Sequence, residues 1–310
     1  MSFELLDWLS LPGDPAKANE DGFAHGLNAA LVLDGATPLG EALMPGPSDA
    51  AWLAQFGARR LMAHLQEGDG ARKALRAALE DARKSFEALR RYPPQQMWQT
   101  PCASMMLAVE VEPGPPLQRK SGRSAGEQGM NRSLTRKPDG GSEIEFLWFG
   151  DCAGLVKEGE AATMVVGETF DKRAAEAMRA ANIAKEKKLS PALDISRPEI
   201  LEPLRASRNQ INSGSQWLFS PDPRAAAHVA RRKMKLARGS ILLLATDGIL
   251  ALASDYGFCD CDGLVAAAMT RGLAELGSQL RAIEAQDQGG DKFPRFKKSD
   301  DATALLLKLV

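Results

Sequence analysis

Short apolar runs, each ending at a turn signal, are the clearest pattern in the chain. Residues 28–33 (NAALVL) run directly into Asp34-Gly35, which predicts a buried strand that ends in a tight turn. Residues 241–245 (ILLLA) lead in the same way to Asp247-Gly248. Apolar segments predict three further strands, at Ser104–Val111, Glu143–Phe149 and Ala304–Val310.

Helical periodicity fills the intervals between these strands. Ser48 precedes apolar residues at helical spacing, and a second helix is predicted from Gly70 to Pro93-Pro94. Residues 171–188 predict an exposed amphipathic helix, and a further helix is predicted around 262–285. Arg224–Arg238 carries six basic residues and no acid, which favours an exposed helix face, with a basic rim beside a substrate as the alternative.

Two segments show no period. Residues 113–142 hold six basic and two acidic residues among Pro, Gly and Ser, and we expect a flexible basic hairpin loop. Residues 188–223 contain five prolines and predict an irregular, flap-like subregion. The order of strands and helices indicates one α+β domain over residues 1–310, without internal repeats.

Charge and composition narrow the function. The chain has 39 basic and 40 acidic residues, so its net charge of −1 argues against binding nucleic acid or an anionic membrane through its overall field. No apolar run reaches the ~18 residues of a membrane span, and the first residues lack the basic and apolar regions of a signal peptide. The four cysteines are too few for a disulfide scaffold. We therefore expect a cytoplasmic protein.

The candidate chemistry lies in carboxylates. With three histidines and no phosphate-binding glycine loop, the chain lacks the signatures of zinc hydrolases and nucleotide-binding enzymes. Acidic residues instead stand at strand ends: Glu20, Asp21, Asp34, Asp247, Asp300 and Asp301. Each alone is ordinary turn chemistry, but converging acids would repel one another unless cations lay between them. Oxygen ligands of this kind suit Mg²⁺ or Mn²⁺.

The order of these motifs resembles that of the metal-dependent (PPM-type) serine/threonine protein phosphatases of the type 2C class, in their bacterial form. The matching segments are Asn19-Glu20-Asp21, Leu31–Gly35, Phe149–Cys152, Leu243–Gly248 and Asp300–Thr303. No single motif is specific, but five in this order and spacing are, and they extend over essentially the whole chain. The resemblance implies a four-layer α-β-β-α sandwich, with two antiparallel sheets flanked by helices.

The resemblance also implies a ligand set for two Mn²⁺ or Mg²⁺ ions. Asp34 would bridge both ions and act in catalysis, and the carbonyl of Gly35 would add a ligand. Glu20 would bind one ion, directly or through water, and Asp247 and Asp300 would hold the other.

Further roles, and some departures, follow from the same resemblance. Asp21 would orient the attacking water, and Asp151 would help to hold a third, weaker ion. The family's phosphate-binding arginine corresponds to Ala16, which leaves Lys17 as the nearest cation, with a point charge in place of a bidentate fork. Ala36 stands where many relatives carry a histidine that acts as a general acid.

The implied activity is removal of phosphate from phosphoserine or phosphothreonine in proteins, opposite a serine/threonine kinase. One alternative is a catalytically weak or inactive relative that binds phosphorylated proteins. Another is an α+β domain whose acids only cap turns. The intact acids favour the enzyme, whereas Ala16 and Ala36 favour the binding module.

Overall fold

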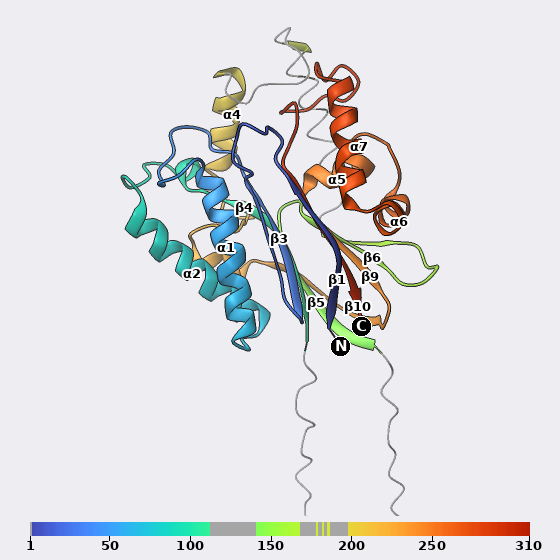
Figure 1. The fold of residues 1–310 in the computed structure, drawn as a ribbon. Coiled ribbons are helices and arrows are strands. Elements are labelled where there is room, and N and C mark those ends of the chain that lie inside the picture. Colours follow the sequence, from blue (N-terminus) through green and yellow to red (C-terminus); the bar gives the residue numbers. More distant parts are fainter. Residues whose placement is uncertain (1, 112–140, 168–177, 179–181, 183–184, 187–197) are drawn as a thin grey trace, which may run out of the picture.

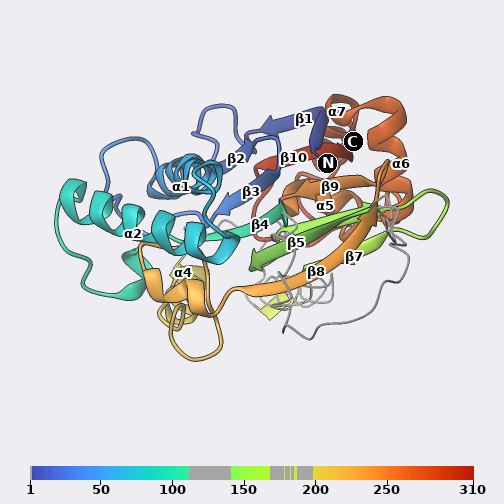
Figure 2. The same cartoon turned by 90° about the horizontal axis from the view of Figure 1, so that it is seen from below.

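The computed structural model describes residues 2–111, 141–167, 178, 182, 185–186 and 198–310. Within these residues, two antiparallel sheets of five strands each pack face to face, with helices on both outer faces (Figures 1 and 2). The first sheet has the order β1-β10-β9-β6-β7 and the second has the order β2-β3-β4-β5-β8. The predicted α+β sandwich is confirmed.

The element bounds are as follows. The first sheet comprises β1 (Phe3–Leu11), β6 (Ala153–Lys157), β7 (Met164–Val166), β9 (Ile241–Ala245) and β10 (Ala302–Leu309). The second comprises β2 (Asp21–His25), β3 (Ala29–Gly35), β4 (Ala103–Glu110), β5 (Gly141–Phe149) and β8 (Ala230–Ala237). The α-helices are α1 (Asp49–Gln66), α2 (Ala71–Leu89), α4 (Pro198–Arg208), α5 (Asp247–Ser254), α6 (Cys261–Arg271) and α7 (Leu273–Gln286), and the short 3-10 turns are η1 (Met97–Gln99) and η2 (Pro223–Ala227).

Three apolar layers hold the sandwich together. One lies between α1, α2 and the second sheet, and another lies between α5, α6, α7 and the first sheet. The third lies between the two sheets, where Phe146, Val32 and Leu305 pack together. Figure 2 shows the two helix groups on opposite sides of the paired sheets.

This arrangement explains the apolar runs in the sequence. In β3, Leu31 and Leu33 face the layer under α1 and α2, whereas Val32 faces the layer between the sheets. In β9, Leu243 and Leu244 divide between two layers in the same way. Because successive side chains of a strand point to opposite faces, a strand covered on both faces needs apolar residues throughout.

Some predicted elements differ from the observed ones. The predicted helix over 262–285 is two helices, because the chain turns at Gly272 with φ +85°. The predicted helix in Arg224–Arg238 is wrong: the segment holds η2 and β8, an exposed edge strand that pairs with β5. In β8, Met234 and Leu236 point toward the layer between the sheets. The many basic side chains of this edge strand hide the alternation of apolar and polar residues in the sequence.

Other predictions fall partly outside the described residues. The segment 188–223 contains α4, and its first ten residues are not among those described. The hairpin 113–142 lies outside them except for its last two residues, which belong to β5. Most of the predicted helix 171–188 lies outside them as well. Among the helices that the structure describes, none is long and apolar enough to cross a membrane.

A candidate metal centre at one end of the sandwich

The second sheet brings three of the predicted acidic residues to one end of the sandwich. Asp21 begins β2 and Asp34 lies near the end of β3, and the antiparallel register places these two residues opposite each other. Asp34 also lies opposite Ser104 of β4. The hydroxyl of Ser104 donates a hydrogen bond of 2.7 Å to Asp151, in the turn that follows β5. Three separate segments thus place a carboxylate beside the same strand end.

The first sheet contributes its acids at the same end. Asp247 is the first residue of α5 and follows β9 after Thr246, and Asp300 is separated from β10 by Asp301. β9 and β10 are neighbours in the sheet, so the end of one lies beside the beginning of the other. A hydroxyl links the two sheets here, because Thr246 donates a 2.9 Å hydrogen bond to Asp21.

The electrostatics show that these side chains converge. Burial raises the pKa of Asp34 well above its ordinary value, and the negative charges of four other aspartates raise it further. Those four are Asp247, Asp21, Asp300 and Asp151. Carboxylates that make one another harder to ionise form an environment that a divalent cation would stabilise.

Asp21 gives a second indication of a cation site. Its side chain is buried, and burial raises its pKa well above the ordinary value, although hydrogen bonds from Thr303 and Thr246 act in the opposite direction. Its Oδ1 atom is buried and meets no hydrogen-bond donor within the described part of the chain. A buried acceptor in that position costs free energy unless a ligand or water satisfies it. The residues present therefore fit a divalent metal ion.

Two hydroxyl groups hold the carboxylate of Glu20. Its carboxylate accepts hydrogen bonds from Thr37 at 2.6 Å and from Ser48 at 2.5 Å. Ser48 is also the N-cap of α1, where it accepts from the N–H of Ala51. Whether Glu20 binds an ion stays a prediction.

Lys17 does not lie in the acidic group. Its side chain is 79% exposed, and its ammonium lies 3.9 Å from Asp14. Neighbouring Ala16 is exposed as well. The phosphate-binding role of Lys17 stays a prediction.

Close backbone approach explains two of the Asp-Gly pairs. A side chain on Gly35 would meet the carbonyl oxygen of Glu20 at 2.5 Å, and one on Gly248 would meet that of Asp301 at 2.0 Å. Neither glycine has a positive φ. The glycines after Asp34 and Asp247 therefore let neighbouring backbone pass close to the acids, which differs from the turn role that the sequence suggested.

Two residues near the site make contacts that the sequence did not predict. Asp301 accepts backbone N–H groups from Gly13 at 2.7 Å and from Glu20 at 2.6 Å, so it fixes the chain before β2. Lys297 places its ammonium 2.7 Å from Asp300. Burial lowers the pKa of Lys297, but the charges of Asp300, Asp34 and Asp247 outweigh it and raise the pKa. The only signal in the sequence was a lysine three positions before an acid.

Lys297 and two of the acids line a cavity beside α5. Its volume is about 130 Å³, and its walls include Asp247, Asp300, Tyr256 and Phe293. The cavity thus joins the acidic group to an aromatic surface.

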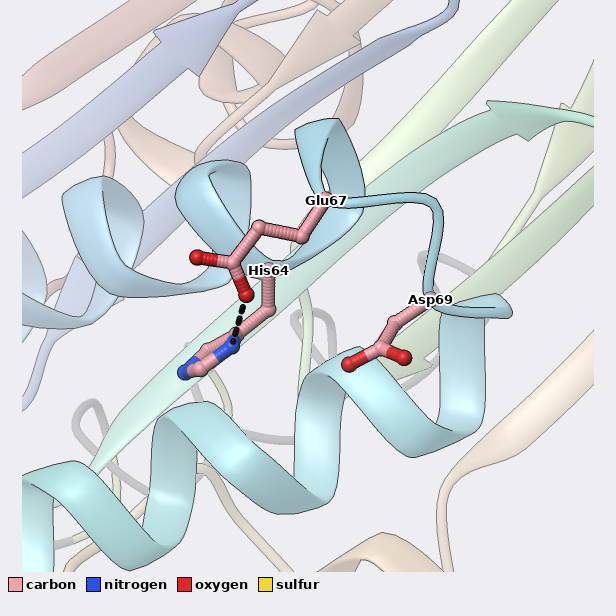
Figure 3. Close-up of side chains that lie close together, drawn as sticks. All are labelled: His64, Glu67 and Asp69. Carbon is pink, nitrogen blue, oxygen red and sulfur yellow. Dashed lines mark ion pairs between the residues drawn. The ribbon is translucent and has the colours of Figure 1, made fainter.

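A different group of potential ligands lies at the corner between α1 and α2 (Figure 3). His64, Glu67 and Asp69 have ligand atoms within 4.8 Å of one another. His64 already contacts Glu67 at 3.3 Å and Asp81 at 2.8 Å, and Asp69 pairs with Lys73. These ion pairs join α1 to α2, which explains why the three side chains lie together without a metal ion.

The fold can be compared with solved structures. The serine/threonine phosphatase PstP/Ppp of Mycobacterium tuberculosis aligns with a TM-score of 0.52 at 13% identity, covering 100% of this chain and 99% of its own. The PPM Ser-Thr phosphatase MsPP of Mycobacterium smegmatis, in complex with cacodylate, gives 0.50 at 14% identity, with 99% and 100% covered. PppA of Pseudomonas aeruginosa, a key regulatory component of the T6SS, gives 0.50 at 13% identity, with 100% and 99% covered.

Sequence comparison adds nothing to this likeness. No family model and no curated protein matches the chain. At 13–14% identity the structural likeness shows the fold alone. The chain therefore has the fold of the PPM serine/threonine phosphatases.

Proposed function

We propose that this protein is a metal-dependent phosphomonoester hydrolase that removes phosphate from phosphoserine and phosphothreonine in proteins. The observation that carries the proposal is the convergence of Asp21, Asp34, Asp151, Asp247 and Asp300 at one end of the sandwich. The fold of the PPM phosphatases supports it.

The acidic residues divide into two sets of ligands. Because aspartates from both sheets act on Asp34, we assign it as the residue that would help to hold both Mn²⁺ or Mg²⁺ ions, and the carbonyl of Gly35 would add a ligand. Asp247 and Asp300 would hold one ion and Glu20 would bind the other, while Asp151 would help to hold a third, weaker ion. When bound, the ions would lower the pKa of water and so supply a hydroxide nucleophile near neutral pH.

The chain's own residues orient the reacting groups. Thr246 donates a hydrogen bond to one oxygen of Asp21. The other oxygen, the buried Oδ1, could then accept a hydrogen bond from the attacking water. Ser48 and Thr37 fix both oxygens of Glu20, and from that position it acts through water. Positioning by such hydrogen bonds holds ligands in one orientation.

The substrate side of the proposal rests on charge. Lys17 and the exposed basic residues Arg231 and Lys233 of β8 would exchange their ion pairs with Asp14, Glu145 and Glu143 for contacts with a phosphorylated protein. We propose that a serine/threonine kinase in the same cytoplasm supplies this substrate.

The test is hydrolysis of p-nitrophenyl phosphate and of a phosphothreonine peptide by the full chain, with Mn²⁺ and with EDTA. We expect turnover with Mn²⁺ that EDTA abolishes, and loss of turnover in Asp247→Asn. Asp69→Asn, which removes an acid from the α1–α2 corner, is the matched control and keeps wild-type rates.

Two results would contradict the proposal. Turnover that persists in EDTA would exclude the metals from the reaction. Mn²⁺ binding without turnover of either substrate would support the alternative of a phosphoprotein-binding module.

A further inference from the structure

The segment between α7 and β10 is held in a defined conformation. Asp287 accepts hydrogen bonds from the backbone N–H groups of Lys292 and Phe293, at 3.1 and 3.0 Å. Arg295 forms a 2.8 Å ion pair with Asp287, and only 14% and 10% of the two side chains are exposed. Phe293 also packs edge-on against Tyr256 at 5.1 Å between ring centroids. These contacts fix the segment two residues before Lys297.

A side chain of α7 anchors the other end of this segment, beside the acidic group. Arg281 of α7 donates hydrogen bonds to the carbonyl oxygens of Asp300, at 2.8 Å, and of Pro12, at 3.0 Å. The backbone of Asp300 is thereby fixed. The chain is therefore anchored both before Lys297, at Arg295, and after it, at Asp300.

Lys297 directs its charge into the acidic group. Its ammonium lies 2.7 Å from Asp300, and about a third of its side chain is exposed. The charges of Asp34 and Asp247 act on it as well. Asp300 therefore already contacts a cation that the chain supplies, and Asp247 lines the same cavity as that cation.

We propose that Lys297 is a built-in cation of this site, which takes the place of the divalent ion at Asp247 and Asp300. The protein then binds one Mn²⁺ tightly, beside Asp34, and accepts a second only when the lysine withdraws. This inference rests on the metal assignment of the proposed function.

The physical reason is repulsion between neighbouring cations. An ammonium and a divalent ion that share the carboxylate of Asp300, in the cavity that Asp247 also lines, lie within a few ångströms of each other, where like charges oppose binding even near a protein surface. Each carboxylate oxygen that accepts from Lys297 is also less available as a ligand. Lys297 also stabilises the folded metal-free protein, because its charge offsets part of the repulsion among the aspartates.

The experiment measures metal stoichiometry, independently of turnover. Metal-free full-length protein is titrated with Mn²⁺ by calorimetry, and free Mn²⁺ is counted in parallel by electron paramagnetic resonance. The variants are Lys297→Gln, which removes the charge, and Lys297→Arg, which keeps it. Lys298→Gln removes the charge of the exposed neighbouring lysine and is the matched control.

We expect one tight equivalent of Mn²⁺ in the wild type, Lys297→Arg and Lys298→Gln, and two in Lys297→Gln. The second ion should bind at least about tenfold more tightly in Lys297→Gln than in the wild type. In EDTA, Lys297→Gln should melt at a lower temperature than Lys298→Gln, because its aspartates lose their counter-ion.

The Mn²⁺ stoichiometry of the wild type already tests the inference, so the test does not depend on whether a variant folds. Two equally tight equivalents in the wild type would overturn it and leave the proposed metal site intact. Stoichiometry and affinity unchanged in Lys297→Gln would do the same. Absence of Mn²⁺ binding in every protein would overturn the metal assignment itself, and with it this inference.

Discussion

Asp34→Asn should have opposite effects on the metal-free and the metal-loaded protein. In the metal-free state, Asp34 is destabilising at neutral pH, because burial and the charges of neighbouring aspartates raise its pKa well above the ordinary value. Asparagine keeps the shape and removes the charge. The variant should therefore unfold at a higher temperature than the wild type in EDTA, and it should lose the stabilisation that Mn²⁺ gives.

The sign and size follow from proton linkage. Folded Asp34 holds its proton to higher pH than the unfolded chain does, so stability falls as pH rises from the ordinary pKa through the raised one. Each pKa unit corresponds to about 1.4 kcal/mol. Because Asp34 keeps part of its surface exposed, solvent screens its neighbours, and we expect a gain of about 1–2 kcal/mol. At about 2–4 °C per kcal/mol, the melting temperature should rise by several degrees.

The assay is thermal unfolding in EDTA and in excess Mn²⁺, from mildly acidic to neutral pH. The wild type should lose stability across this range in EDTA, and Asp34→Asn should lose less. Asp222→Asn is a control of opposite sign. Burial works against the charge of Asp222, but hydrogen bonds from Arg224 outweigh it and hold its pKa below the ordinary value, so this variant should be less stable at neutral pH.

Two results would refute this reasoning. A lower melting temperature for Asp34→Asn in EDTA at neutral pH would mean that the aspartates do not repel one another in the folded protein. An equal gain from Mn²⁺ in the variant and the wild type would mean that Asp34 is not a ligand.

Further predictions concern the supports of the site and its leaving group. Thr246→Val should lower the free energy of unfolding by about 1–3 kcal/mol in urea denaturation, because Asp21 loses a buried donor; restoration by Thr246→Ser would confirm the hydroxyl as the cause. Asp301→Ala should cost a similar ~1–3 kcal/mol, since Gly13 and a second backbone N–H lose their acceptor, while Asp301→Asn should cost less. Because Ala36 cannot donate a proton, aryl phosphates should turn over faster than a phosphothreonine peptide by about 10²–10⁴-fold, and Ala36→His should reduce that gap.

The sequence predicted the strands best where both faces are buried. The runs at 28–33 and 241–245 became β3 and β9, because a strand between two apolar layers leaves an unbroken apolar signal. β1 and β8 were missed, since edge strands carry polar and charged residues that hide the period of two. A register shift between Leu5 and Asp7 further breaks the alternation in β1.

The residues of the candidate site also differ in whether the sequence alone could identify them. Asp34 and Asp247 could be found from the sequence, because each stands at the end of a strand with a clear apolar signal. Lys297 could not, and neither could the backbone N–H groups that Asp301 holds, since both depend on which distant segments the fold places beside them. The role of Gly248 likewise needed the backbone of Asp301, which lies far away in sequence.

The pairing of β1 with β10 has a consequence for how the protein folds. Ser10 and Thr303 share a hydrogen bond of 2.8 Å although 293 positions separate them, and β10 lies between β1 and β9 in the sheet. During synthesis, β1 and β9 therefore have no partner between them until β10 emerges. Contacts between such distant segments form slowly. We expect joining of this sheet to be a late kinetic step, during which β1 is exposed to chaperones and to aggregation.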